Sequence, residues 1–538
     1  MIVIKPEKLS GMVPRMLELT SRLTRWHRRD WRAGTLELVE ETLNEALIPG
    51  THGEALKEMR SHLSRALGAD PAVTQEQKRI IGCLDSINPL NGEDGYDAQL
   101  AWRLCKDIEK SYIQQWASIF DDAGTAGRVD VEGSAKRIVS HLLYLGLPAP
   151  SVYNLLKERH QAAEQHSFSD VMRELDRRVE LAPKSFTFAV PVDRDPTFLH
   201  IRPFPPNWLN AKELREWKDR HAPNAKNLRH HGGFLLTVDA RDVNEAADAV
   251  RALLPQFAFK FETDAKGSFS VLPMMWSQER GATFPTQRYP EQLKLQAFRR
   301  AEMLPRLEME PDVRNMLAIV EPLKSMTSHV VVVNGWVAIE SLLVGPEDPD
   351  RIGAERMAGI VAAAYFRTEL AWLAGNYVRK YGENGPLGRA IAKAENSLQR
   401  SQLMARAILG ECDVTRLDCP DQIAVEKMRV ALTGQKAVFE RTKAILQREF
   451  LRMYRKRNLI VHSGRVLEHG IDSISVKVKP LLMAGIDQIL IARLQHNVGP
   501  QELAALVEYN VRSLPRNASD HGVALWNLLE PDAGAIKE

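Results

Sequence analysis

The sequence predicts a mainly α protein with an N-terminal helical region, a small central α/β domain and a C-terminal helical bundle. In the first and third parts apolar residues recur three and four positions apart, which is the period of an amphipathic helix. Between them, short β-branched and aromatic runs alternate with turn residues, as strands do. The predicted boundaries are 1–180, 181–285 and 286–515, with a loose tail over 516–538.

The N-terminal region is predicted to be helical throughout. Ile138, Leu142 and Leu145 show the spacing that puts apolar side chains on one helix face. Glycine and proline clusters divide the region into separate helices, near 49–53, 89–95 and 146–150.

The central domain is predicted to combine strands with one helix. Strands are expected at Ser185–Pro191, Phe198–Ile201, Gly233–Val238, Phe257–Phe261 and Ser268–Leu272. A helix is expected over Asp242–Leu254, because its apolar residues share one face. Residues 202–208, RPFPPNW, are expected to form a loop. Strand, helix and strand in close succession indicate a small α/β unit, and no catalytic pattern lies within it.

The C-terminal part returns to helical patterns. Helices are expected from Trp336 to Leu343, from Glu355 to about Tyr381, and over about 424–463. Pro500 opens a last helix, roughly Gln501–Leu514, and Pro515 ends it.

Composition restricts the classes of protein that this chain can belong to. The net charge of +3 is weak, so any nucleic-acid binding must come from local clusters. The cysteines are expected to be reduced thiols, at positions 83, 105, 412 and 419. The start lacks the apolar core of a signal peptide, and Val330–Val344 is too short to span a bilayer. We therefore expect a cytoplasmic protein without a membrane segment.

The helix predicted to end near residue 463 has two distinct faces. Four apolar residues follow spacings of seven, four and three, which places them on one stripe: Phe439, Leu446, Phe450 and Met453. Four arginines follow the same spacings on another side, and His462 continues their line: Arg441, Arg448, Arg452 and Arg455. A line of arginines that leads to an imidazole is suited to an RNA backbone, so these arginines are predicted to bind RNA.

The end of this helix carries an arginine, an asparagine and a histidine in close succession. The sequence YRKRNLIVHSG, residues 454–464, places Arg457, Asn458 and His462 at the spacing R-N-x-x-x-H. An imidazole titrates near neutral pH and can move a proton, while a guanidinium can hold a phosphate by two hydrogen bonds. The stretch resembles the signature of the HEPN superfamily (higher eukaryotes and prokaryotes nucleotide-binding domain).

The resemblance covers about residues 310–515 and implies a function. A long N-terminal region before an HEPN-type bundle is similar to ApeA-type anti-phage proteins. The resemblance implies an endoribonuclease of bacterial anti-phage defence, or a toxin, that cuts RNA by 2′-hydroxyl attack. His462 would move the proton, Arg457 would stabilise the phosphate charge, and Asn458 would orient the imidazole or hold substrate. Glu340 would support the site by pairing with Arg457, or is an ordinary surface carboxylate.

Partners follow from the same resemblance. They are RNA, with a tRNA anticodon loop as one target, a phage-derived trigger and a second copy of the chain.

On an ideal helix Arg457 points about 140° away from His462. Either the helix kinks before Gly464, or the site is built across a homodimer, as is common in the family. No Walker A loop is present, and no cofactor is expected.

Two competing readings stay open. In the first, the HEPN-like bundle is a non-catalytic scaffold or sensor that dimerises and binds a phage protein or nucleic acid. In the second, a sensing N-terminal half gates a C-terminal nuclease, which is the arrangement we prefer.

Two further patterns are interpreted as structural. Arg22, Arg25, Arg29 and Arg32 are expected on one helix face with two tryptophans among them, either as an RNA clamp or as a solvated face over core tryptophans. We favour the solvated face. His230 and His231 lack a third ligand, so no metal site is expected.

Overall fold

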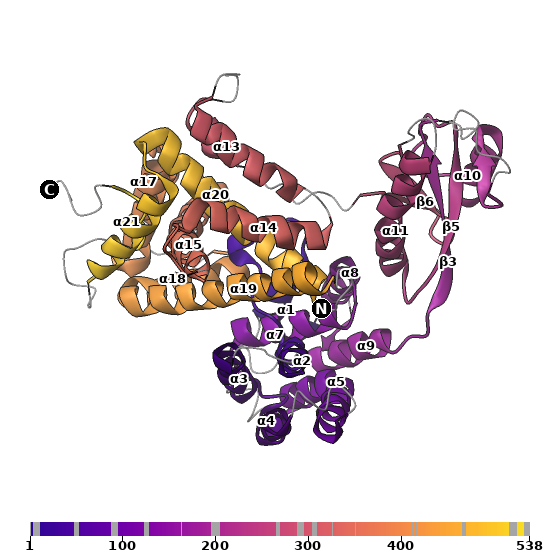
Figure 1. Cartoon of the computed structure of the whole chain (residues 1–538), viewed down its shortest axis with the longest axis horizontal. Helices are drawn as coiled ribbons and strands as arrows, with labels where there is room; N and C mark the ends of the chain where they lie inside the picture. The colour runs from indigo at the N-terminus through magenta and orange to yellow at the C-terminus, as the bar shows by residue number, and fades with distance from the viewer. Residues whose placement is uncertain are drawn as a thin grey trace.

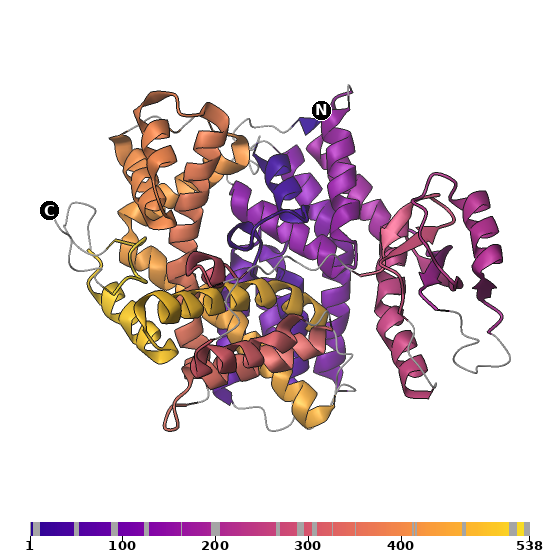
Figure 2. The same ribbon diagram turned by 90° about the horizontal axis from the view of Figure 1, so that it is seen from above.

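The structure is a computed structural model of the chain. It describes residues 2–3, 11–47, 53–87, 95–122, 129–162, 164–194, 205–264, 270–287, 295–303, 309–324, 327–349, 351–411, 414, 417–464, 470–515 and 524–531. The predicted fold class is confirmed, because the protein is mainly helical with a small central antiparallel sheet of five strands. Figures 1 and 2 show the sheet domain at the side of the two helical parts.

The N-terminal region contains α1 (Met12–Thr20), η2 (Trp26–Arg28), α2 (Thr35–Ala46), α3 (Gly53–Gly68), η3 (Thr74–Glu76), α4 (Gln77–Ser86), α5 (Tyr96–Asp121), α7 (Val131–Tyr144), α8 (Ala149–Gln161) and α9 (Phe168–Val179). A short parallel pair joins β1 (Ile2–Val3) to β2 (His166–Ser167). The predicted apolar face is buried, since Ile138 and Leu142 are fully covered in the core of this region.

The segment from Ser21 to Gly34 differs from the prediction. Only the short 3-10 turn η2 forms there, so the arginines at 22, 25, 29 and 32 do not share a helix face. Trp31 is 8% exposed and belongs to the core of the C-terminal bundle, and Trp26 stacks on it. The two tryptophans therefore join the N-terminal region to the bundle.

The central domain contains β3 (Lys184–Val192), β4 (Trp208–Asn210), α10 (Ala211–His221), β5 (Gly232–Ala240), α11 (Val243–Asp264), β6 (Met274–Ser277) and β7 (Thr283–Pro285). The strands pair in the order β4-β5-β3-β6-β7, and every neighbouring pair is antiparallel. Alternate residues of β3 point to opposite faces, so Phe188 packs under α11 while Ala189 packs under α10.

Several predicted strands of this domain need correction. The strand predicted at Phe257–Phe261 is wrong, because α11 continues through Pro255 and Phe257 packs edge-on against Phe234 of β5. Of Ser268–Leu272, residues 268–269 lie outside the described residues, and Val271 forms only an isolated bridge to Val192. The predicted strand Phe198–Ile201 lies outside them as well. The predicted loop ends where Trp208 opens β4.

The C-terminal part contains α12 (Ala297–Arg300), α13 (Pro311–Val320), η6 (Glu321–Lys324), α14 (Ser328–Leu343), α15 (Ile352–Tyr381), α16 (Gly385–Lys393), α17 (Ser397–Arg406), the π-helical turn η7 (Ala407–Glu411), α18 (Cys419–Thr433), α19 (Gln435–Ser463), α20 (Ile471–His496) and α21 (Pro500–Arg512). The helices α15 and α21 match their predictions closely, whereas α14 begins at Ser328, eight residues before the predicted start at Trp336. The predicted single helix over 424–463 is two helices, because Gly434 separates α18 from α19.

The chain beyond α21 is not loose where the structure describes it. Leu525, Leu528 and Leu529 are at most 6% exposed and lie in the core of the bundle. Asn510 donates a hydrogen bond of 3.1 Å to the carbonyl of Leu528, and Arg367 pairs with Glu530 at 2.7 Å. The prediction of a loose tail is therefore wrong for residues 524–531.

The N-terminal region docks on the bundle through buried ion pairs. Arg28 of η2 pairs with Glu369 of α15 at 2.7 Å and with Asp421 of α18 at 2.5 Å. Glu132 of α7 pairs with Lys427 of α18. Figure 1 shows α19 lying across the N-terminal helices. Within the described residues, every helix falls short of the length and apolar character needed to cross a membrane.

Candidate active site

The candidate site lies at the C-terminal end of α19. The apolar stripe of this helix is packed as predicted, with Phe439, Leu446, Phe450 and Met453 all at most 1% exposed. The helix stays continuous to Ser463, and Gly464 ends it in the left-handed conformation, φ +63°. The amide of Gly464 donates to the carbonyl of Ile460 at 3.1 Å. The first predicted resolution, a kink that joins Arg457 to His462, is therefore absent from this helix.

Arg457 and Asn458 form a polar cluster with α14. The Nη1 of Arg457 donates to the Oδ1 of Asn458 at 3.0 Å, and its Nη2 lies 4.0 Å from the Oε2 of Glu340. Glu340 in turn accepts a hydrogen bond of 2.5 Å from the indole nitrogen of Trp336, one turn earlier. Trp336 is fully buried and packs against Tyr454 at 4.7 Å. Of the two alternatives for Glu340, a partner of Arg457 or an ordinary surface carboxylate, the structure shows a long contact with Arg457.

The Arg457 guanidinium is only partly used. Its side chain is 24% exposed, and that of Glu340 is 33% exposed. Its Nε is buried and has no hydrogen-bond acceptor within the part of the chain that the structure describes. The side chain therefore reaches solvent, and its Nη2, which lies 4.0 Å from Glu340, is the donor left for an anion.

His462 lies apart from this cluster. Its imidazole is exposed, and no side chain among the described residues accepts or donates a hydrogen bond to it. Five residues of continuous helix place it about 7.5 Å further along the axis than Arg457 and about 140° around it. Asn458 lies between them, one residue after Arg457 and four before His462, on nearly the same face as the imidazole.

The four arginines predicted to bind RNA differ in how far they are exposed to solvent. Arg441 is exposed, while Arg448 and Arg455 are half-buried against the N-terminal region. Arg452 is 2% exposed, and helix α2 covers it. Its Nη2 and Nε donate to the two carboxylate oxygens of Glu41 at 2.6 and 2.8 Å, and further contacts reach Glu37 at 3.1 Å and Glu449 at 2.5 Å. In this conformation Arg452 is withdrawn from any RNA backbone.

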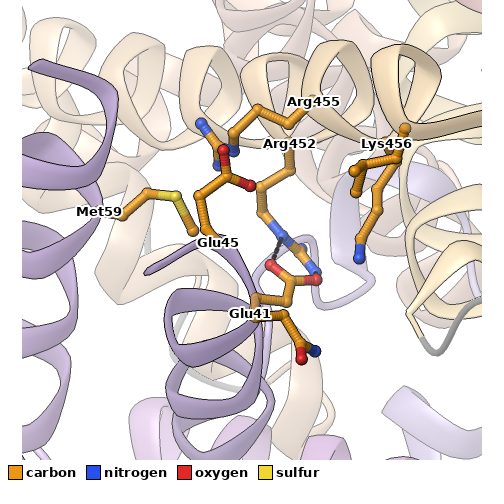
Figure 3. A pocket seen from close by; sticks show the side chains of 8 residues that line it. Glu41, Glu45, Met59, Arg452, Arg455 and Lys456 are labelled. Atoms are coloured by element: carbon orange, nitrogen blue, oxygen red, sulfur yellow. Dashed lines mark hydrogen bonds and ion pairs between the residues drawn. The ribbon is translucent and has the colours of Figure 1, made fainter. Parts of the chain in front are cut away.

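Figure 3 shows the cavity between α2, α3 and this face of α19, with Glu41 and Glu45 directed toward the arginines. The carboxylates around the Arg452 guanidinium take the place of its water shell, so their attraction offsets the cost of burying its charge. Burial would by itself raise the pKa of Glu37, but the charges of Lys477 and Arg452 outweigh it and lower that pKa well below its usual value. Lys477 and Ser473 of α20 also bond to Glu37, at 2.9 and 2.5 Å. Sequence reasoning missed these carboxylates, because spacing on α2 does not identify a partner 400 residues away.

No significant match is found when the chain is compared with protein-family models, with curated proteins and with solved structures.

Across the described ranges, no group of three or more His, Cys, Asp or Glu side chains is arranged to hold a metal ion. Of the two adjacent histidines, the His230 ring lies 5.9 Å from that of Trp276.

Proposed function

We propose that this protein is a metal-independent endoribonuclease of the HEPN type, acting in the cytoplasm in anti-phage defence or as a toxin. The observation that carries the proposal is the end of α19. An exposed imidazole, a partly exposed guanidinium with a spare donor and an amide between them lie within six residues. The sequence resemblance to HEPN ribonucleases assigns roles to the same three residues.

The reaction needs only these groups. One imidazole removes the proton of a ribose 2′-hydroxyl, and its oxygen attacks the adjacent phosphorus. The bond from phosphorus to the 5′-oxygen breaks, and that oxygen takes a proton from an imidazolium. The products are a 2′,3′-cyclic phosphate and a 5′-hydroxyl, without gain or loss of water. Arg457 stabilises the extra charge on the phosphorane, and Glu340 positions Arg457. DNA lacks the nucleophile and stays intact.

A second copy of the chain completes the site in this proposal. Within one copy Arg457 and His462 diverge by about 140° along a straight helix. A two-fold axis near the end of α19 brings the imidazole of each copy toward the guanidinium of the other. The two copies would then share two equivalent sites.

Mixing two inactive variants tests this arrangement. Arg457→Ala and His462→Ala are each expected to lose cleavage. When they are co-refolded in equal amounts, roughly half of the dimers are mixed, and each mixed dimer has one intact site of two. Cleavage should return to roughly a quarter of the wild-type rate. Failure of the mixture to recover any cleavage, with mixed dimers demonstrated by mass spectrometry, would refute the shared site.

The second candidate function is a non-catalytic scaffold or sensor that dimerises and binds a phage protein or nucleic acid. The observation that favours it is that Arg457 already contacts Asn458 and lies near Glu340, while His462 stays separate. Such a scaffold would keep dimerisation and cellular protection when both residues are replaced, whereas the ribonuclease would lose protection.

Gating by the N-terminal region fits the nuclease proposal. The carboxylates of α2 neutralise Arg452 beside the site, and Trp31 fills the bundle core. A phage-derived trigger that pulls α2 from α19 would expose the arginine line. Glu41→Gln weakens this contact without removing the region, so we expect it to raise cellular toxicity, while Glu158→Gln, at an exposed position of α8, should not.

A further inference from the structure

A second group of cations lies beside the neutralised arginine network, where α3 meets α19. It consists of Arg65 and His62 from α3, Arg448 from α19 and Arg32 from the segment before α2. Arg32 and Arg65 are exposed, whereas His62 and Arg448 are half-buried. His62 and Arg448 line one cavity together with Met59. We call this group the α3–α19 cation cluster.

The members are close enough to repel one another. Burial lowers the pKa of His62 to about 3, and the charges of four arginines add to the effect: Arg448, Arg452, Arg65 and Arg32. Burial also lowers the pKa of Arg448, and the charge of Arg65 contributes. His62 is therefore a neutral imidazole held among guanidinium groups.

Unlike Arg452, the three arginines of the cluster lack a carboxylate partner. In the described residues, Arg32, Arg65 and Arg448 form no ion pair, and Arg65 donates only to the Ser61 carbonyl at 3.2 Å. The carboxylates that act on Arg448 are Glu449, which already holds Arg452, and the exposed Glu58. Of the carboxylates that line the cavity with Arg448, Glu41 already holds Arg452 and only Glu58 is available, so an anion would relieve the repulsion among the guanidinium groups.

The cluster is aligned with His462 along α19. Arg448 and Arg455 precede His462 by fourteen and seven residues, so they lie only about 40° and 20° away around the helix. They are about 21 and 10.5 Å from it along the axis. Arg455 also lines the cavity with His62 and Arg448. Between Arg448 and His462, Glu41 and Glu45 of α2 line the cavity beside Arg455. A chain of phosphates bound at the cluster would therefore reach the imidazole along this side once α2 moves away from α19.

We propose that the α3–α19 cation cluster binds the phosphate backbone of the RNA substrate and leads the strand toward His462. This inference rests on the proposed function and adds a substrate surface to which the N-terminal region contributes. Guanidinium groups bind phosphate by paired hydrogen bonds and read no base, so the contacts are independent of sequence. The neutral imidazole of His62 gains a favourable partner when a phosphate arrives.

Salt dependence of RNA binding tests this surface. The full chain carrying His462→Ala binds a fluorescent single-stranded RNA without cutting it, and anisotropy is recorded over a range of KCl concentrations. Each phosphate contact contributes about 0.7 to the slope of log affinity against log salt for a single strand. The triple variant Arg32→Ala, Arg65→Ala and Arg448→Ala should therefore lower the slope by ~2 and weaken binding at low salt.

A matched triple variant controls for bulk charge. Arg177, Arg220 and Arg229 are exposed arginines on α9 and the central domain, and their replacement by alanine removes the same charge. The slope should stay at the value of the His462→Ala parent. If the first triple variant unfolds, Arg32→Ala and Arg65→Ala are measured singly, because both side chains are exposed, and each should lower the slope by about 0.7.

The outcomes separate this inference from the proposed function. An unchanged slope in the cluster variant, an equal loss in the control, or no RNA binding by the parent would overturn it. Cleavage is measured separately with His462 intact. If cleavage does not depend on the cluster, the proposed nuclease is supported and the proposed RNA surface is contradicted. If binding depends on the cluster but no cleavage occurs, the RNA surface is supported and the nuclease is contradicted.

Discussion

Arg452 offers the sharpest test of how the two helical regions are joined. Replacing it with methionine keeps the volume and removes the charge, so the carboxylates of Glu37, Glu41 and Glu449 lose their common partner. Removing one member of a buried ion pair costs about 3–5 kcal/mol, because the other charge stays desolvated. Glu37 retains Lys477 at 2.9 Å, whereas Glu41 loses contacts of 2.6 and 2.8 Å. We expect a loss of roughly 3–5 kcal/mol in the free energy of unfolding.

The assay is urea unfolding followed by tryptophan fluorescence, since Trp31 lies in the same junction. Arg441→Met on the same helix is the control, because Arg441 is exposed and its replacement should change stability by less than about 0.5 kcal/mol. Adding Glu41→Gln and Glu449→Gln to Arg452→Met should restore part of the loss. Equal stabilities of Arg452→Met and Arg441→Met would refute the account of Arg452 as a buried structural charge.

Other predictions concern pH, a helix end and the C-terminal segment. Burial lowers the pKa of His141 to about 3 and that of His27 well below its usual value, so both stay neutral in the folded protein. The contribution of these two histidines to the free energy of unfolding should be fully present above about pH 6.5. It should fall below that pH, by up to about 1.4 kcal/mol per pH unit for each histidine. Urea unfolding midpoints measured at pH 7 and pH 5 check this. Gly464→Ala should cost about 1 kcal/mol, because alanine disfavours φ +63°. Gly82→Ala, in open space within α4, should instead stabilise by up to about 1 kcal/mol. Leu528→Ala should cost about 2–5 kcal/mol, measured by the same unfolding assay.

A change in the opposite direction would contradict each of these predictions. A flat stability profile between pH 7 and 5 would mean that the buried histidines titrate as in the unfolded chain. Equal effects of Gly464→Ala and Gly82→Ala would remove the role of the left-handed helix end. A neutral Leu528→Ala would mean that the segment 524–531 does not pack in solution.

Local sequence patterns were sufficient to predict those helices and strands in which the buried residues follow the period of the apolar residues. Helix α15 and strand β5 were predicted with nearly correct limits, because apolar spacing and flanking glycines or prolines act within the element itself. Helix α10 was missed although its sequence carries a start signal. Asn210 caps it and Glu213 bonds back to the Asn210 amide at 2.9 Å, which is the capping-box pattern.

The errors arise where distant segments decide the structure. The alternating aromatics after Pro255 suggested a strand, but contact with β5 retains them on α11. Arg452 looked solvent-facing on a helical wheel, and only the docking of α2 shows that it is buried. For the candidate site, the sequence offered Glu340 as a partner of Arg457 but assigned Asn458 to His462 or to substrate, and the structure instead bonds Asn458 to Arg457. The separation of His462 depends on α19 staying straight.

Cleavage of RNA tests the central proposal most directly. Total cellular RNA is incubated with the wild-type protein in EDTA, beside His462→Ala and Arg457→Ala, with and without lysate of phage-infected cells. The account predicts cleavage by the wild type only, leaving 2′,3′-cyclic phosphate ends. Equal cleavage by both variants, or RNA left intact by the wild type in either condition, would contradict it.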